Sequence, residues 1–338
     1  MERGLVLEIN DLCVELSIGG TWVQALNDVS LTIHRGEVLG LVGESGSGKS
    51  LTALSIAGLL PDNARVTKGS VRLRREEVLG KSEHELNTLR ARSVALVFQN
   101  PTSYLNPVLT VGAQIAEIFD LNPELLDQSA TRPRRERRRE AWRRTIEALR
   151  LVRIPDPERV VKRYPFELSG GMQQRAVIAM ALVREPDLII ADEITTALDV
   201  TVQAQILSLL SELRRTIGMT LLLITHDMGI VAQLADRVAV MYSGSVVESA
   251  DVASLFNAAK HPYSRALLET VPTLRGDRTV FRPIPGAMPA LTDPPVGCRF
   301  HPRCPDRFDE CSRVKPEPIP LGDGRTAACH LYEAVRSE

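Results

Sequence analysis

The sequence predicts an α/β fold in which a phosphate-binding loop opens a parallel-sheet core. Two observations carry this prediction. The glycine-rich segment Gly43–Ser50 lies between an apolar run and a helix-like run, and strand-like and helix-like segments alternate between residues 188 and 241. Such alternation is typical of right-handed βαβ units. The flanking segments predict an antiparallel β portion before the loop, a helical subdomain at about residues 100–168, and a small cysteine-rich C-terminal extension.

Length and composition limit the class of protein. The chain has 338 residues, 44% of them hydrophobic, and a net charge of −1. We expect a nucleotide-binding domain over residues 1–260 and the extension over residues 261–338, where proline, arginine and cysteine become frequent. The charge balance argues against extensive nucleic-acid binding. No apolar run approaches the ~18–20 residues that cross a bilayer. Residues 5–9 read as a strand rather than a signal peptide, so we expect a cytoplasmic protein that reaches the membrane through partners.

The elements can be predicted in chain order. Residues 1–42 read as strands with turns at Gly19-Gly20 and at residues 34–36. Strand signals vanish between residues 99 and 168, where residues 111–119 and 140–151 read as helices. Apolar runs at residues 188–191, 220–224 and 238–241 predict buried parallel strands, with a helix over residues 202–213.

The phosphate loop has the spacing G-x-x-x-x-G-K-S. Backbone N–H groups of such a loop and of the following helix bind phosphate oxygens, which the helix dipole also favours. Lys49 is expected to reach the β- and γ-phosphates and Ser50 to bind Mg²⁺. The alternative is a glycine- and serine-rich turn that matches by chance. The expected ATP-binding residues here are Gly43, Ser45, Gly46, Ser47, Gly48, Lys49 and Ser50.

An acid pair ends the apolar run at residues 188–191. Two carboxylates at the end of a buried strand are costly without a function. Beside a phosphate loop, Asp192 suits the Mg²⁺ shell and Glu193 suits the general base that polarises the attacking water. A pair of helix-capping acids is the alternative interpretation.

The segment Leu168–Arg175 is a second anion-binding helix start, because a serine and two glycines open a predicted helix that ends before Pro186. At this point the chain resembles the ATP-binding cassette (ABC) family, whose signature motif it matches except at Met172. The resemblance implies that Ser169, Gly170 and Gly171 contact the nucleotide held by a second subunit. It therefore implies a head-to-tail dimer that encloses two ATP molecules with Mg²⁺.

Shorter motifs of the same family are present in the expected order. By resemblance, Gln99 senses Mg²⁺ and links the site to the membrane part, Asp199 crosses the dimer interface, and His226 contacts the γ-phosphate as a catalytic residue. Taken singly, Gln99 would read as a surface glutamine and His226 as a strand-end histidine. Ile194 stands where the family has proline. Trp22 is the aromatic residue near the region expected to contact adenine, and that contact stays unassigned.

Four cysteines lie in the last 41 residues. In a reducing compartment, clustered thiols indicate a metal site rather than disulfides, and four thiolates suit zinc or an iron–sulfur cluster. The tail resembles the C-terminal extension of ATPase subunits of dipeptide and oligopeptide importers, through residues 261–268, 284–286, 297–298, 301–305, Cys311 and 329–330. Members of that group carry a 4Fe-4S cluster, which we favour over Zn²⁺. The expected ligands are Cys298, Cys304, Cys311 and Cys329.

The resemblance implies an ATP-hydrolysing subunit that powers import of di- or oligopeptides. Its partners would be two membrane permeases, an extracytoplasmic solute-binding protein and a second ATPase subunit, homologous or identical, at the cytoplasmic face of the membrane. Nickel or another solute is an alternative cargo, and a non-transport ABC ATPase or a regulatory nucleotide-binding partner are alternative functions. The arginine-rich run at residues 131–144 reads as a solvated helix face, with attraction to anionic lipid as the second interpretation.

Overall fold

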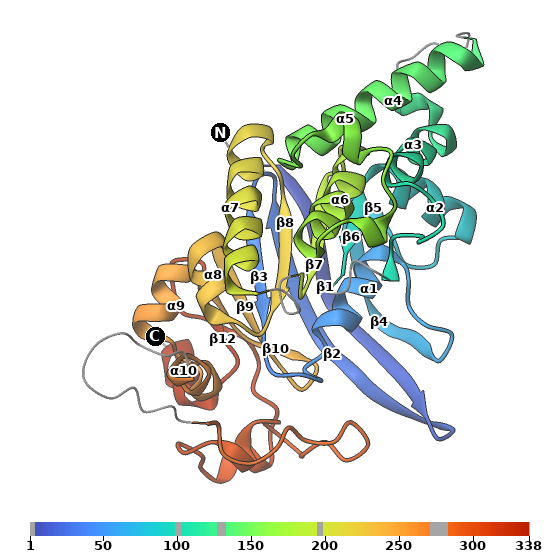
Figure 1. Cartoon of the computed structure of the whole chain (residues 1–338). Coiled ribbons are helices and arrows are strands. Elements are labelled where there is room, and N and C mark those ends of the chain that lie inside the picture. The colour runs from blue at the N-terminus through green and yellow to red at the C-terminus, as the bar shows by residue number, and fades with distance from the viewer. Residues whose placement is uncertain (1–3, 99–102, 127–132, 195–198, 271–282, 338) are drawn as a thin grey trace, which may run out of the picture. The chain divides into compact units, whose positions relative to one another are not determined.

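A computed structural model of the chain describes residues 4–98, 103–126, 133–194, 199–270 and 283–337 (Figure 1). Contacts along the chain divide it into two units. Unit 1 comprises residues 1–81 and 221–338, and unit 2 comprises residues 82–220. The boundary that the composition predicts at residue 260 stays a prediction.

Unit 1 contains an antiparallel sheet in the order β2-β1-β4-β5. Its strands are β1 (Leu5–Ile18), β2 (Thr21–His34), β4 (Ala64–Leu73) and β5 (Glu76–Glu77). Gly19 and Gly20 join β1 to β2 with φ of 58° and 83°, the left-handed pair that a two-residue hairpin requires. This hairpin confirms the strands and the first turn that the sequence predicts, and β1 and β2 are the long strands drawn in blue in Figure 1.

Unit 1 also contains the parallel strands of the core. β3 (Val38–Val42) pairs in parallel with β8 (Leu221–Thr225) on one side and with β9 (Arg237–Tyr242) on the other. β10 (Ser245–Asp251) runs antiparallel to β9, and the short β12 (Thr326–Ala327) and β11 (Ile319–Pro320) follow it. β3 and β8 are buried along their whole length, as expected for apolar strands that pack on both faces. The helices of this unit are α1 (Lys49–Ala57), α8 (Met228–Leu234), α9 (Val252–Ala258) and α10 (Pro262–Glu269).

The C-terminal extension shares a hydrophobic core with β9 and β10. Tyr242 of β9, Tyr263 of α10 and Phe300 of the extension are all at most 1% exposed and pack in one cluster. Beyond α10 the chain contains short 3₁₀ turns at His301–Arg303, Asp309–Ser312 and His330–Ser337. Through these aromatic contacts the extension packs against β9, the neighbour of β3 in the sheet.

Unit 2 pairs β6 (Val94–Val97) in parallel with β7 (Leu188–Asp192). Among the described residues from 103 to 168 there is no strand, so the predicted helical subdomain is helical. The helices of unit 2 are α2 (Glu83–Arg92), α3 (Val111–Leu121), α4 (Arg134–Leu151), α5 (Pro157–Val160), α6 (Gly170–Leu182) and α7 (Val200–Ile217), with 3₁₀ turns at Pro123–Leu126 and Pro165–Glu167.

The arginine-rich run forms the first half of α4. Arg134, Arg135, Arg138 and Arg139, in the first turns of the helix, are exposed, whereas the buried residues Ala141, Thr145, Ala148 and Leu149 lie in its later turns at helical spacing. Arg143 and Arg144 pair with Glu140 on the same helix. The run is therefore a solvated helix face, and its attraction to lipid stays a prediction.

Candidate functional site

The phosphate loop lies between β3 and α1, as predicted, and its backbone needs glycine. Gly48 caps α1 with φ of 106°, and a Cβ there would lie 2.8 Å from Leu26 Cδ2. A Cβ on Gly43 would lie 2.1 Å from the carbonyl oxygen of Met241, a backbone atom that cannot yield. The strand behind the loop thus presses against it so closely that a side chain at Gly43 is excluded.

Lys49 is only 5% exposed, and its ammonium is hydrogen-bonded to the loop. Nζ donates hydrogen bonds to the carbonyl oxygens of Gly43 at 2.8 Å and Glu44 at 2.9 Å. Ser47 is buried, whereas Ser45, Gly46 and Ser50 are exposed. The loop therefore presents accessible groups at the start of α1, with a cation held beneath them, which is an arrangement suited to binding phosphate.

The acid pair ends β7, as the sequence predicts. Asp192 is the last residue of the strand and is 8% exposed. Glu193 is half-buried and adopts φ of 51°, a left-handed conformation that costs a non-glycine residue about 1–3 kcal/mol and is frequent at functional sites. Burial and then the charge of Asp192 raise the pKa of Tyr104, whose ring stacks 5.1 Å from that of Phe98.

The signature segment opens α6 in the predicted manner. Ser169 caps the helix, its Oγ accepting the N–H of Met172 at 3.4 Å. Asp199 caps α7 and accepts the N–H groups of Thr201 and Val202, each at 3.0 Å. The Ser169 and Asp199 side chains are exposed. Both helix starts are therefore closed by side chains and remain accessible to a ligand or a partner.

The first turns of α6 and α7 are in close contact. A Cβ on Gly171 would lie 2.7 Å from Val202 Cγ1. The structure thus brings the signature segment against the first turn of the helix that Asp199 caps, in a contact between residues 31 positions apart in the sequence. The second glycine of the signature is therefore needed for this packing.

His226 follows β8 directly and is exposed, while Asp227 caps α8 by accepting the N–H of Gly229 at 2.7 Å. Gln99 and the first two residues of the segment Ala197-Leu198-Asp199 lie outside the residues that the structure describes. The predicted roles of Gln99 therefore stay predictions.

All four cysteines of the extension line one small cavity in unit 1, together with Phe300 and His330. Burial raises the pKa of the Cys298 and Cys329 thiols to about 11 each, and neighbouring cysteines contribute to the shift. Burial also raises the pKa of Cys304. Thiolates rather than thiols bind metal, and a bound cation removes this penalty, so the four cysteines that line this cavity are the candidate metal ligands of the extension.

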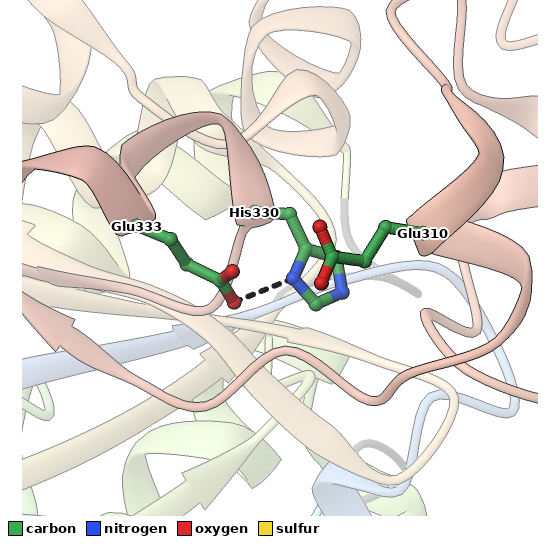
Figure 2. A group of neighbouring side chains, drawn as sticks. All are labelled: Glu310, His330 and Glu333. Carbon is green, nitrogen blue, oxygen red and sulfur yellow. Dashed lines mark hydrogen bonds and ion pairs between the residues drawn. The ribbon is translucent and has the colours of Figure 1, made fainter.

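A second group of possible ligands lies nearby. Glu310, His330 and Glu333 approach one another closely, as Figure 2 shows. However, His330 Nε2 donates to the carbonyl oxygen of Val314 at 2.8 Å, and Nδ1 lies 2.5 Å from the Glu333 carboxylate. Protein groups thus occupy both ring nitrogens, and this cluster anchors the last turn of the chain rather than holding a cation.

Sequence reasoning missed the residues that join the extension to the phosphate loop. Arg303 forms a bidentate ion pair with Glu44, and the Tyr263 hydroxyl accepts the Glu44 N–H. The partners are separated by 259 and 219 positions. No local pattern marks such a pair, although Arg303 lies in the segment that carries the family resemblance of the tail.

Comparison with known proteins agrees with this arrangement. Residues 26–196 match the family model described as ABC transporter, which is just over half of the chain. The chain belongs to the ABC transporter family. Residues 247–311 of this ABC chain match a second model, described as the C-terminal region of oligopeptide/dipeptide transporters.

Curated relatives extend the match over the whole ABC chain. It is 44% identical over 97% of its length to the dipeptide transport ATP-binding protein DppD of Bacillus subtilis, covering 95% of that protein. It is 46% identical over 98% of its length to the oligopeptide transport ATP-binding protein OppD of Mycobacterium tuberculosis. The chain spans about half, 52%, of the length of the mycobacterial relatives.

Solved structures match the ABC fold. The dimeric post-hydrolysis state of the ATP-binding cassette MJ0796, bound to ADP and Pi, is 28% identical, with a TM-score of 0.61 over 73% of this chain and 98% of that chain. CbiO1 from Clostridium perfringens is 27% identical, with a TM-score of 0.62 over 76% of this chain and 92% of that chain. Among the residues that the structure describes, no helix has the length and apolar character needed to span a membrane.

Proposed function

We propose that the chain is the ATP-hydrolysing subunit of an ABC importer of di- or oligopeptides. The observation that carries the proposal is the joint match of one chain to the ABC transporter model and to the oligopeptide/dipeptide C-terminal model. The intact phosphate loop, with the buried Lys49 beneath it, supports ATP binding. Two membrane permeases, a second ATPase subunit and an extracytoplasmic solute-binding protein are the expected partners, at the cytoplasmic face of the membrane.

Each motif has a role in this proposal. The loop N–H groups and Lys49 bind the phosphates, and Ser50 and Asp192 hold Mg²⁺. Glu193 acts as the general base that polarises the attacking water, and its left-handed backbone supports a functional rather than a structural role. His226 contacts the γ-phosphate. Ser169, Gly170, Gly171 and Asp199 complete the site of a second subunit.

The decisive test of this chemistry compares two variants. Glu193→Gln removes the base and leaves the phosphate loop intact, so ATP binding persists and turnover falls by about 10²–10⁴-fold. Lys49→Ala instead weakens nucleotide binding itself. Equal steady-state hydrolysis by wild type and Glu193→Gln would contradict the assignment of the base, and unchanged nucleotide affinity in Lys49→Ala would contradict the proposed phosphate site.

The cargo is tested with the subunit co-purified with its permeases in liposomes. Stimulation of ATP turnover by the solute-binding protein loaded with short peptides is the expected result. Stimulation by nickel alone would keep the transporter and change its cargo. Failure to recover any permease with the chain would favour a non-transport ATPase.

We further propose that Cys298, Cys304, Cys311 and Cys329 hold a 4Fe-4S cluster. The proposal is supported by the position of the four thiols along one cavity, where burial, with a smaller contribution from the neighbouring cysteines, raises the pKa of Cys298 and Cys329. When bound, the cluster would link the four cysteine-bearing segments of the extension to one another, or would make the extension respond to redox state. Iron, sulfide and zinc analysis of protein purified without oxygen tests this proposal. Zinc without iron would indicate a zinc site in place of the cluster. The absence of both iron and zinc would contradict a metal centre.

A further inference from the structure

The loop between Cys298 and Cys304 contacts the phosphate loop directly, and all residues involved belong to unit 1. Arg303 Nη1 and Nη2 donate to the two carboxylate oxygens of Glu44 at 2.6 and 3.0 Å. The Arg303 side chain is 5% exposed, and its Nε donates to the carbonyl oxygen of Pro285 at 2.8 Å. A bidentate, largely buried pair of this kind fixes geometry as well as adding energy.

Glu44 is held at three points. Its carboxylate accepts from Arg303, its N–H donates to the Tyr263 hydroxyl at 2.9 Å, and its carbonyl oxygen accepts from Lys49 Nζ at 2.9 Å. One residue of the phosphate loop thus connects the C-terminal extension to the ammonium expected to bind phosphate. A displaced Glu44 would move a hydrogen-bond partner of Lys49.

The groups that hold Glu44 are themselves rigid. The rings of Tyr242 and Tyr263 have centroids 4.6 Å apart, and the Phe300 ring lies 5.1 Å and 5.3 Å from them. The Arg303 guanidinium lies 5.8 Å from the centroid of Tyr242. Because these rings are fully buried and mutually packed, the positions of Tyr263 and Arg303 are set by the core rather than by solvent.

The same cysteine loop reaches the phosphate loop by a second route. Arg299 Nη1 donates to the carbonyl oxygen of Ser243, in the turn between β9 and β10. The next residue, Gly244, donates its N–H to the carbonyl oxygen of Ser47 at 2.8 Å. Two arginines between the same two cysteines therefore support two different parts of the phosphate loop.

The cysteine loop is also short and internally bonded. The N–H of His301 donates to the carbonyl oxygen of Cys298 at 2.9 Å, and that of Cys304 to the carbonyl oxygen of His301 at 3.3 Å. Arg303 is the immediate neighbour of Cys304. A displacement of Cys298 or Cys304 is therefore expected to move the Arg303 guanidinium as well.

We propose that Arg303 is a positioning residue for the phosphate loop, and that the cysteine loop transmits the state of the four-thiol site to nucleotide affinity. The first part rests on the contacts above, and the second part also rests on the proposed cysteine centre. The ligand whose affinity is affected is a nucleoside triphosphate with Mg²⁺. Loss of the ion pair between Arg303 and Glu44, here called the Glu44 clamp, lowers the affinity for the nucleotide rather than the rate of its cleavage.

The test measures Mg²⁺-ATP affinity of the full chain by titration, with KM and kcat of ATP turnover measured alongside. Arg303→Ala raises Kd and KM by about tenfold with little change in kcat, which corresponds to about 1.4 kcal/mol of lost positioning. Arg303→Lys, which keeps the charge without the bidentate geometry, gives an intermediate loss. Arg313→Ala is the matched control, because that arginine of the extension is 75% exposed.

Glu44→Gln keeps the test valid if Arg303→Ala fails to fold, because it alters the clamp from the other side. The double variant Arg303→Ala/Glu44→Gln is expected to lose no more affinity than the worse single variant, since both remove one interaction. Unchanged affinity in folded Arg303→Ala or Arg303→Lys overturns the positioning role. So does a fully additive double variant.

Cys304→Ser tests transmission, with metal content and nucleotide affinity measured on the same sample. The expected result is loss of bound metal and a Kd raised by about as much as in Arg303→Ala, with no further rise when the two changes are combined. Loss of metal with unchanged Kd overturns the transmission and leaves the metal centre standing. A wild-type chain without bound metal rejects the centre, while the Arg303 result still decides the positioning role.

Discussion

Asp28 offers a direct test of how the extension is held to the N-terminal sheet. Lys315 of the extension lies 2.6 Å from Oδ2 of this carboxylate, and Lys68 of β4 lies 2.8 Å from Oδ1. These two hydrogen bonds, that from Lys315 first, hold the pKa of Asp28 well below its ordinary value of 3.8. One carboxylate therefore joins β2 to segments 40 and 287 positions away.

Asp28→Asn removes the charge with little change of shape. Asp28 has φ of 52°, and asparagine tolerates this left-handed conformation as well as aspartate does. A single exposed ion pair contributes about 0.2–1 kcal/mol. Because two lysines share this carboxylate and its side chain is 34% exposed, we expect a loss of about 1–2 kcal/mol in the free energy of unfolding at pH 7.

The pH dependence has a definite sign. The pKa of Asp28 is lower in the folded chain than in the unfolded chain, so the unfolded chain binds more protons as pH falls. The stabilisation is present above the unfolded pKa and is lost as pH falls through and below it. The difference between wild type and Asp28→Asn is therefore constant from pH 8 to pH 5 and shrinks below about pH 4.

Chemical or thermal unfolding of both chains at several pH values measures this difference. The control is Glu15→Gln, which breaks one ion pair in the same sheet with Arg65, whose side chain is 51% exposed. That control is expected to change stability by about 0.5 kcal/mol or less. A loss in Asp28→Asn no larger than in the control, or one that persists undiminished at pH 3, would refute the reasoning.

Two further predictions concern glycines at the motifs. Gly171→Ala places a Cβ 2.7 Å from Val202 Cγ1 and should lower stability by about 1–3 kcal/mol in thermal unfolding; Val202→Ala in the same chain should restore most of it, and no restoration would contradict the packing. Gly43→Ala places a Cβ 2.1 Å from the carbonyl oxygen of Met241 and should abolish nucleotide binding in a titration. Gly80→Ala is its control, because Gly80 also has a positive φ, 77° against 155° for Gly43, but open space around the new methyl group; equal binding by the two would contradict the clash.

The sequence predicted the elements whose burial is uniform or whose ends are capped. The runs that became β3, β7 and β8 are apolar throughout, and a strand buried on both faces needs no alternation to be recognised. The helix starts at Ser169 and Asp199 were predictable because each offers a side-chain oxygen to free N–H groups.

Other elements could not be predicted, because their stability comes from partners distant in sequence. β4 contains mostly exposed or half-buried residues before Val71, and it is a strand because β1 pairs with it over residues 7–16. Tertiary pairing of this kind overrides local composition. The helix α2 was missed for a related reason: one of its ten residues, Leu89, is buried, and its capping box at Ser82 and Glu85 carries the local signal.

The candidate site shows the same division. Motif spacing predicted a loop between a strand and a helix and an acid pair at the end of a strand, and the structure has them between β3 and α1 and at the end of β7, while the contacts of these residues with phosphate stay predictions. The support behind the loop was invisible, since Arg303, Tyr263 and Met241 approach Glu44 and Gly43 only after the chain folds. Spacing therefore finds motifs that are contiguous in the chain and misses the distant residues that hold them in place.

The extension consequently packs within unit 1, the unit that contains the phosphate loop. It is attached through Lys315 to Asp28, through Arg299 to the β9–β10 turn, and through Arg303 to the phosphate loop. Two of these three attachments reach the phosphate loop, that of Arg303 through the Glu44 carboxylate and that of Arg299 through the β9–β10 turn, whose Gly244 N–H donates to the carbonyl oxygen of Ser47. A metal centre at the cysteines would act on these contacts, because fixing the loop between Cys298 and Cys304 also fixes the two arginines that make them.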